Sequence, residues 1–195
     1  MKLNVVEVFD SIQGEGHWMG VYCTFIRLPG CNYACPFCDT DFSKADKVLD
    51  TDTTEFQKHV VITGGEPSIH PSIGALIEAL HERECVVHVE TNGTDISCVI
   101  EADWITCSPK REEWLKSSSC KPNWHIFRNV VSEYKLVVDE LFNPQDWLDE
   151  GPILWLQPCD GLYKEESKQR ILEIVRTYPR KFRAGIQLHK WYEVV

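Results

Sequence analysis

Three cysteines lie on one short stretch of the chain, with three residues between the first two and two residues between the second and third. They are Cys31, Cys35 and Cys38. Thiolates gathered in this way hold zinc or an iron–sulfur cluster. A structural zinc site usually takes four ligands from two such loops, and the sequence has no second C-x2-C pair. Three ligands in one loop suit a four-iron cluster with one iron open to an exogenous ligand, while a degenerate zinc knuckle stays the alternative.

A second stretch with chemical potential is Gly64-Gly65-Glu66-Pro67, which directly follows an apolar run that is typical of a buried strand. The glycines allow a ligand to approach the backbone closely, and the proline stiffens the exit from the turn. A backbone carbonyl and the Glu66 carboxylate can accept the protons of an ammonium group. A tight turn alone would explain the glycines but not the acid.

The composition narrows the class of partner and the compartment. The 195 residues carry a net charge of -10, which argues against a nucleic-acid-binding surface and favours a small-molecule substrate. The nine cysteines are an odd and unevenly spaced set, the first residues show no signal-peptide pattern, and no apolar stretch approaches the length of a membrane span. These features predict reduced thiols in the cytoplasm and no contact with a membrane.

The pattern of apolar runs predicts how these motifs are positioned. Strand-like runs alternate with helical or long connections, which indicates a mostly parallel sheet of βα units. We expect strands over 3–9, 22–28, 60–63, 85–90, 104–107, 134–139, 153–156 and 185–189, helices over 72–84 and 163–178, a polar loop over 41–57, and irregular structure over 111–130. About six parallel strands with two core helices predict an open, partial (β/α) barrel that forms a single domain over 1–195. Ligands of such folds sit at the carboxyl ends of the strands, where both motifs fall.

The cysteine spacing, the aromatic Phe37 before the third cysteine and the Gly-Gly-Glu-Pro turn together resemble the radical S-adenosylmethionine (SAM) enzymes. The resemblance implies a partial barrel of the radical SAM type. It also implies a [4Fe–4S] cluster on Cys31, Cys35 and Cys38, whose open iron chelates SAM. The amino group of SAM would then lie against Gly64, Gly65 and Glu66.

Further motifs narrow the resemblance to one branch of that family. These are Ser11-Ile12-Gln13-Gly14-Glu15-Gly16, Phe25-Ile26-Arg27, Gly30-Cys31-Asn32, Cys38-Asp39-Thr40, Glu90-Thr91-Asn92-Gly93 and Ser108-Pro109-Lys110. They are similar to the branch that converts 6-carboxytetrahydropterin to 7-carboxy-7-deazaguanine, a queuosine and archaeosine precursor. The resemblance runs from about Phe9 to Lys190 and implies radical chemistry in which the pterin ring contracts and loses ammonia.

The resemblance also implies roles for individual residues. Gln13, Glu15, Arg27 and Thr91 would form the catalytic set, and Ile12, Gly14 and His189 would complete the substrate site. SAM would contact Phe37, Cys38, Asp39, Gly93, Ser108, Pro109, Lys110 and Gln157 besides the Gly-Gly-Glu turn. For Gln157 and His189 a purely structural role is about as well supported by the sequence. Thr40 would bind Mg²⁺, a hard ion that prefers oxygen ligands. The implied partners are a flavodoxin or ferredoxin reductant and a second copy of the chain in a homodimer.

Two other functions remain open on the sequence. An activating protein for a glycyl-radical enzyme shares the cluster spacing and the small size, but its protein substrate gives no reason for the Gln13, Glu15 and Arg27 set. A non-catalytic zinc or iron–sulfur scaffold would explain the cysteines, but not Glu66 or the motifs at Thr91 and Ser108.

Overall fold

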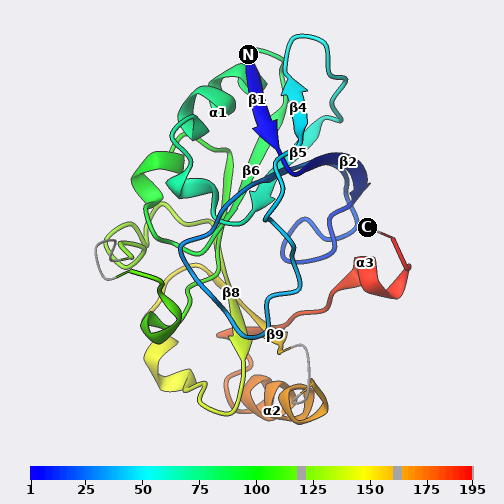
Figure 1. Ribbon diagram of the computed structural model, residues 1–195. Coiled ribbons are helices and arrows are strands. Elements are labelled where there is room, and N and C mark those ends of the chain that lie inside the picture. The colour runs from blue at the N-terminus through cyan, green and yellow to red at the C-terminus, as the bar shows by residue number, and fades with distance from the viewer. Residues whose placement is uncertain (118–121, 160–163, 195) are drawn as a thin grey trace.

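The structure, a computed structural model, describes residues 1–117, 122–159 and 164–194 and is built around one eight-stranded sheet (Figure 1). The strand order is β10-β9-β8-β7-β6-β5-β3-β2, and a separate two-stranded sheet pairs β1 with β4. The strands are β1 (Lys2–Val5), β2 (Glu7–Ile12), β3 (Tyr22–Leu28), β4 (Lys47–Asp50), β5 (His59–Gly64), β6 (Val86–Thr91), β7 (Trp104–Cys107), β8 (Glu133–Val138), β9 (Ile153–Pro158) and β10 (Phe182–Ala184). The helices are α1 (Ile73–His81), α2 (Lys164–Thr177) and α3 (Leu188–Trp191), with short 3-10 turns at Pro67–Ile69, Ile96–Val99, Glu112–Trp114 and Pro144–Trp147.

All neighbours from β3 to β10 pair in parallel, and only the edge strand β2 runs antiparallel to β3. The two edge strands, β2 and β10, do not pair with each other among the described residues, so the sheet stays open. The expected open, partial barrel with a mostly parallel sheet is therefore confirmed.

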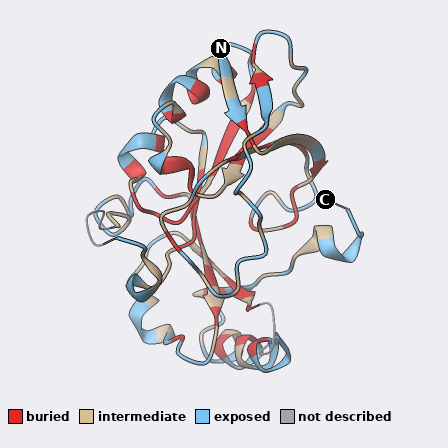
Figure 2. Cartoon of the chain, in the orientation of Figure 1, coloured by how far each residue is buried: buried red, intermediate tan, exposed pale blue. Residues whose placement is uncertain are grey.

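The two main helices cover the outer face of the sheet with the apolar faces that their sequences predict. Ile73, Leu76, Ile77 and Leu80 of α1 are buried, as are Ile171 and Ile174 of α2. Val175 in α2 and Tyr178 directly after it pack partly buried against the same core. Figure 2 shows this core as buried residues that follow the central strands and the inward sides of both helices.

The inner face of the sheet is polar because strand residues alternate between the two faces. In β8, Tyr134 and Leu136 join the apolar core, whereas Lys135 and Val137 line a cavity on the other side. Alternation along one strand thus separates the residues that stabilise the fold from those that face the cavity.

The loop between β2 and β3 folds across this inner face. Its Gly16 has a φ of 70° and lies so close to the sheet that a Cβ atom would be 2.3 Å from Oε1 of Glu133. The buried Glu133 carboxylate accepts hydrogen bonds from the backbone N–H of His17, at 2.9 Å, and from Nε1 of Trp155, at 2.7 Å. Only glycine fits this close approach in the left-handed region, and Glu133 anchors the loop that carries Gln13 and Glu15.

Three of the expected elements are wrong. The run 3–9 is split at Val6 into two strands. Residues before Val6 form β1, which pairs with β4, whereas the N–H of Val6 donates to the carbonyl of Arg27 and the chain then continues as β2 beside β3. The loop expected over 41–57 contains that strand β4. The strand expected over 185–189 ends earlier, at Ala184, because Gly185 makes a last bond to Leu156 and the chain then turns into α3. The expected irregular stretch and the start of the second helix fall partly on 118–121 and 163, which lie outside the described residues.

Among the described residues, none of the helices is both long enough and apolar enough to cross a membrane.

Candidate active site

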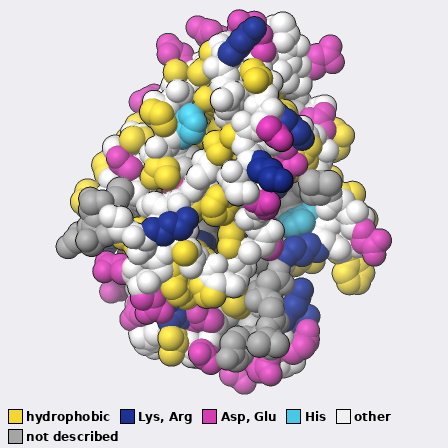
Figure 3. All heavy atoms as spheres, in the orientation of Figure 1, with side chains coloured by type: hydrophobic (Ala, Val, Ile, Leu, Met, Phe, Trp, Pro, Cys, Tyr) yellow, Lys and Arg dark blue, Asp and Glu magenta, His cyan; other side chains and the backbone are white. Residues whose placement is uncertain are grey.

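A cavity of about 830 Å³ opens at the carboxyl ends of the strands. Of the residues predicted as site residues, it is lined by Ile12, Gln13, Gly14, Glu15, Arg27, Cys31, Cys35, Phe37, Cys38, Asp39, Thr40, Gly64, Gly65, Glu66, Thr91, Ser108, Lys110, Gln157 and His189. In the space-filling view, several Lys and Arg side chains lie near the middle of the drawn face, while acidic ones lie towards both its upper and its lower edge (Figure 3). Segments that are far apart in the sequence therefore converge on one space, as the sequence predicts for strand-end motifs.

The three cysteines of the first motif are free thiols on the wall of this cavity. Their loop is fixed from the side by the 111–116 segment, because Ala34 donates to the carbonyl of Trp114 and Lys116 to that of Asn32. Burial raises the pKa of the Cys31 thiol and raises that of Cys35 to about 11. Lys116 near Cys31 and Lys110 near Cys35 only partly oppose this effect on the pKa values. Metal binding requires thiolates, so a bound metal would have to stabilise the deprotonated form.

A four-iron cluster and a single zinc ion place different demands on these thiols. A zinc ion binds its thiolates at about 2.3 Å, so they must crowd around one point. Within the described parts of the chain, no group of three His, Cys, Asp or Glu side chains is arranged to hold one metal ion. In a four-iron cluster each cysteine binds its own iron atom, so the sulfurs need not converge.

The Gly64-Gly65-Glu66 turn packs directly onto the entrance of the cysteine loop. A Cβ atom on Gly65 would lie 1.6 Å from the carbonyl oxygen of Gly30, and the N–H of Glu66 donates to the same oxygen at 2.8 Å. Gly64 has a φ of 125°, a region that other residues rarely adopt. The glycines are thus required by the close approach of two backbones, which joins the two predicted cofactor motifs.

The Glu66 carboxylate is buried and its oxygens accept hydrogen bonds from within the protein. Oε1 accepts from the N–H of Ser68 at 2.9 Å and from the Thr91 hydroxyl at 2.5 Å, and Oε2 accepts from the N–H of Asn92 at 2.5 Å. Burial raises the pKa of Glu66 despite these donors. The side chain therefore braces the loop after β6 in addition to lining the cavity.

The residues predicted for the pterin lie on the β2–β3 side of the cavity. Nε of Arg27 donates to Oε1 of Glu7 at 2.6 Å, and the guanidinium lies over the Phe9 ring, 5.7 Å from its centre. A Cβ atom on Gly14 would lie 1.9 Å from Nδ1 of His189, so the C-terminal segment packs on this loop. Sequence positions 14 and 189 thus form adjacent parts of one wall.

Gln157 gives a direct indication of a missing ligand. It lines the cavity with 4% of its surface exposed, yet neither Nε2 nor Oε1 of its amide has a hydrogen-bond partner in the described structure. A buried amide without partners is costly, so a polar ligand is expected to complete it. Lys110 also lines this cavity, and its Nζ donates to Oγ of Ser108 at 2.5 Å, which fixes the ammonium group on the cavity wall.

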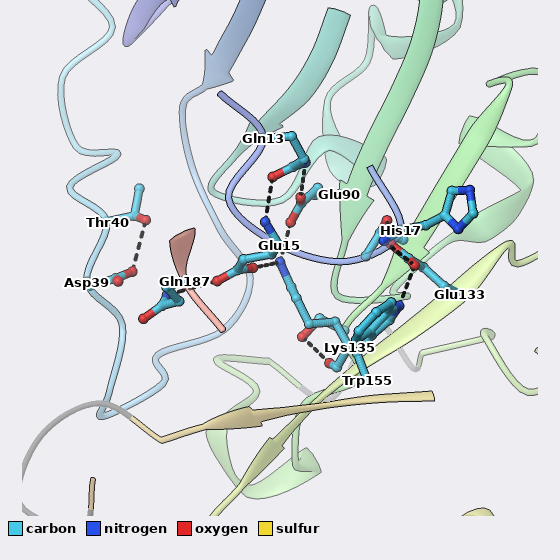
Figure 4. Close-up of polar contacts among 12 residues, drawn as sticks. Gln13, Glu15, His17, Asp39, Thr40, Glu90, Glu133, Lys135, Trp155 and Gln187 are labelled. Atoms are coloured by element: carbon cyan, nitrogen blue, oxygen red, sulfur yellow. Dashed lines mark hydrogen bonds and ion pairs between the residues drawn. The ribbon is translucent and has the colours of Figure 1, made fainter. Parts of the chain in front are cut away.

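Thr40 and Asp39 extend the cysteine loop on the opposite side of the cavity (Figure 4). The Thr40 hydroxyl lies 3.5 Å from Oδ1 of Asp39, and Lys190 donates to Oδ2 of Asp39 at 2.8 Å. Two oxygen-bearing side chains at the cavity mouth suit a hard cation.

Two predicted site residues lie outside the lining of this cavity. Gly93 is in the left-handed region, with φ 82°, and packs against Cys107 and Trp124. Pro109 lines a neighbouring cavity of about 450 Å³, which shares Phe37 and Lys110 with the first.

Sequence reasoning gave no role to several charged and amide side chains of the cavity, namely Glu90 (although it stands in one of the quoted motifs), Lys116, Lys135, Gln187 and Lys190. Lys135 lies inside β8, and Glu90 is the next-to-last residue of β6. What could have identified them is that each is a charged residue in an otherwise apolar strand. Because strand side chains alternate between the two faces, such a residue is expected on the face opposite the core. Gln187 and Lys190 fell in or beside the wrongly expected last strand.

Comparison with known proteins first defines the class. Residues 25–116 match the model of the Radical SAM superfamily, which agrees with the open barrel and its three-cysteine loop. Members of this class use a [4Fe–4S] cluster and SAM, and the free thiols and the unpartnered Gln157 amide fit these groups.

The family within that class follows from full-length relatives. A 7-carboxy-7-deazaguanine synthase of Bacteroides thetaiotaomicron is 33% identical over 200 residues, which cover 100% of both chains. One from Neisseria meningitidis is 36% identical over 97% of this chain and 93% of its own. The crystal structure of QueE from Escherichia coli superposes with a TM-score of 0.75 and 25% identity, covering 96% of this chain and 95% of that one. The chain belongs to the 7-carboxy-7-deazaguanine synthase family.

Proposed function

We propose that this protein converts 6-carboxytetrahydropterin to 7-carboxy-7-deazaguanine with loss of ammonia, as a radical SAM lyase of the queuosine pathway. The observation that carries the proposal is the convergence of three groups on one cavity: the cysteine loop, the Gly64–Glu66 turn and the Gln13, Glu15 and Arg27 set. The names of the full-length relatives support the same reaction.

Cys31, Cys35 and Cys38 would hold the cluster, which in its reduced form would supply the electron for the cleavage of SAM. The protein's own residues orient the reactants and exclude water. We assign the amino end of SAM to the Gly64–Glu66 turn, and other parts of SAM to Ser108, Lys110 and the unpartnered amide of Gln157. Phe37 and Asp39 would flank the adenosyl group of SAM. Gly93 and Pro109 would contribute to SAM binding through the backbone of their loops.

The pterin would occupy the β2–β3 side of the cavity. Ile12, Gln13 and Gly14 would contact its ring, and Arg27 with Thr91 and His189 would fix the rest of the molecule. Arg27 offers a planar fork for a carboxylate, although Glu7 already occupies its Nε. Since Glu7 offsets part of the Arg27 charge, a second cation near an anionic substrate is useful. We propose that Mg²⁺ would fill this role and that Thr40 would help to hold it.

The proposed setting follows from the cofactors. A cluster with an open iron needs a reducing compartment, and we propose the cytoplasm, with a flavodoxin or ferredoxin as reductant. We also propose a single domain that forms a homodimer and binds neither nucleic acid nor membrane. The continuous sheet and the net charge of -10 support the domain assignment and the absence of nucleic acid.

The decisive experiment is an anaerobic reaction of reduced, cluster-loaded enzyme with SAM, Mg²⁺ and 6-carboxytetrahydropterin, followed by mass spectrometry. We expect 7-carboxy-7-deazaguanine and released ammonia. Accumulation of 5′-deoxyadenosine without any deazapurine, together with a glycyl radical on a partner protein, would instead support the activating-protein function.

A further inference from the structure

Two carboxylates face the cavity on the side assigned to the pterin. Glu15 comes from the loop after β2 and Glu90 from the end of β6, and their side chains are only 12% and 18% exposed. Two negative charges placed so close to each other and so far from water repel each other and lose solvation. Some other group must therefore hold them together.

That group is Lys135, from the inner face of β8. Its Nζ donates to Oε2 of Glu15 at 2.5 Å and to Oε2 of Glu90, so one ammonium bridges both acids (Figure 4). The Lys135 side chain is 14% exposed. Burial opposes the charge of Lys135, but Glu15 and Glu90 outweigh it and raise the pKa of Lys135 above its ordinary value. Burial would likewise raise the pKa of Glu90, yet Lys135 holds it below the ordinary value.

The second oxygen of each carboxylate is held by an amide. Nε2 of Gln13 donates to Oε1 of Glu90 at 3.0 Å, and Nε2 of Gln187 donates to Oε1 of Glu15 at 2.9 Å. The N–H of Glu15 in turn donates to Oε1 of Gln13, at 3.2 Å. Each carboxylate oxygen therefore accepts one hydrogen bond from the protein and keeps a second lone pair. These lone pairs form a fixed group of acceptors on the cavity wall.

We propose that Lys135 is a positioning residue that fixes Glu15 and Glu90 as paired acceptors for the N–H donors on the aminopyrimidine edge of the substrate. This inference rests on the proposed function. The 2-amino-4-oxo-pyrimidine ring of a pterin carries a ring N–H beside an exocyclic amine, and ionised carboxylates only accept hydrogen bonds. A site built to bind such donors rejects a ligand that lacks them, because its buried acceptors are then left unpaired. Lys135 and Glu90 thereby set the selectivity for aminopterins without touching the reacting carbon.

The test measures binding without turnover. Cluster-loaded enzyme with SAM but no reductant is titrated with 6-carboxypterin and with its 2-deamino analogue. Wild-type protein should bind the pterin at least about tenfold more tightly than the analogue, since a hydrogen bond to a charged group contributes that much affinity. Lys135→Met should lose about tenfold to a hundredfold in pterin affinity and lose most of the preference. Lys135→Arg, which keeps the positive charge, should retain part of both the pterin affinity and the preference. Lys168→Met on the exposed face of α2 is the matched control.

A pH series separates positioning from a merely structural effect. In Lys135→Met the loss of the bridging ammonium should favour protonation of the acid pair, so pterin affinity should rise with pH, whereas that of the wild type should stay flat. If Lys135→Met does not fold, Lys135→Met/Glu90→Gln, which removes one charge of each sign, should fold and bind both ligands with little preference. The inference is overturned, and the proposed function left intact, if Lys135→Met keeps the wild-type preference for the pterin over its 2-deamino analogue and shows a flat pH response. The same holds if the double variant keeps that preference. Failure of wild type to bind either pterin overturns the proposed function instead.

Discussion

The hydroxyl of Thr91 donates to the Glu66 carboxylate at 2.5 Å, and this bond joins the turn that follows β5 to the end of β6. The same carboxylate accepts from the N–H of Asn92 at 2.5 Å. The residue assigned to SAM and the residue assigned to the pterin are thus parts of one buried hydrogen-bond network. A substitution at Glu66 should therefore alter both the side of the cavity assigned to SAM and the side assigned to the pterin.

Glu66→Gln should weaken SAM binding while iron content stays near wild type. The amide nitrogen cannot accept from Thr91 or Asn92, so the free energy of unfolding should fall by about 1–3 kcal/mol and SAM affinity by about tenfold to a hundredfold. Calorimetric titration with SAM and thermal unfolding measure the two effects. Glu78→Gln, on the exposed side of α1, is the control, and wild-type SAM affinity in Glu66→Gln would contradict the assignment.

Alanine at Cys31, Cys35 or Cys38 should remove the cluster, whereas alanine at Cys23 or Cys107 should not. The first three thiols line the cavity, while Cys23 and Cys107 are buried within strands of the sheet. Iron and sulfide per chain, with the brown absorbance of anaerobically purified protein, give the measurement. Iron loss in Cys107→Ala as complete as in Cys35→Ala would refute the three-ligand assignment.

Gly65→Ala should destabilise the protein by about 1–3 kcal/mol and lower its iron content, because the new Cβ would meet the Gly30 carbonyl. The obstacle is backbone, so the cysteine loop itself has to shift. Gly74→Ala is a matched control, since nothing lies within 4 Å of a Cβ there, and alanine in α1 should stabilise by about 0.5–1 kcal/mol. Full iron in Gly65→Ala would show that the two loops do not depend on each other.

Thr40→Val keeps the shape of the side chain but removes its hydroxyl. It should reduce the stimulation of deazapurine formation by Mg²⁺ more than it reduces SAM cleavage without substrate. Product formed against Mg²⁺ concentration in wild type and variant tests this. Identical Mg²⁺ curves would place the ion elsewhere.

Stability should fall on acidification because of His88. Burial, with the neighbouring His59 ring at 2.9 Å, lowers the pKa of His88 to about 4, and Asp103 and Glu90 only partly oppose this. Between pH 6.5 and 4, His88 is protonated in the unfolded state but neutral in the folded state, so the free energy of unfolding rises with pH. Between pH 7 and pH 5 this one group should cost about 1–2 kcal/mol. Urea unfolding at both pH values should show a smaller difference in His88→Asn than in wild type or His125→Gln.

The sequence allowed prediction of those parts of the site that lie at strand ends. Cysteine spacing and glycine turns carry local constraints, so Cys31, Gly65 and Arg27 could be assigned to one cavity from their motifs alone. Lys135 and Glu90 could not, because their pairing depends on which strands become neighbours and on which face each residue takes. The C-terminal strand was wrong because the chain turns into α3 after the last bond of Gly185 to Leu156. A Cβ atom on Gly185 would lie 2.7 Å from the Gln157 side chain, a contact between distant segments that the sequence does not show.

The contacts of the C-terminal segment have a consequence for how the protein is made. Gln187 binds Glu15 across 172 positions of sequence, Leu188 donates to the carbonyl of Gly14, and Lys190 pairs with Asp39. Synthesis proceeds from the N-terminus, so the cysteine loop and most strands of the sheet emerge before this segment. The wall beside the pterin is finished only after residue 190 has left the ribosome. A nascent chain therefore carries a cluster loop before it has a closed substrate site, and we expect stalled chains to gain iron before they gain pterin affinity.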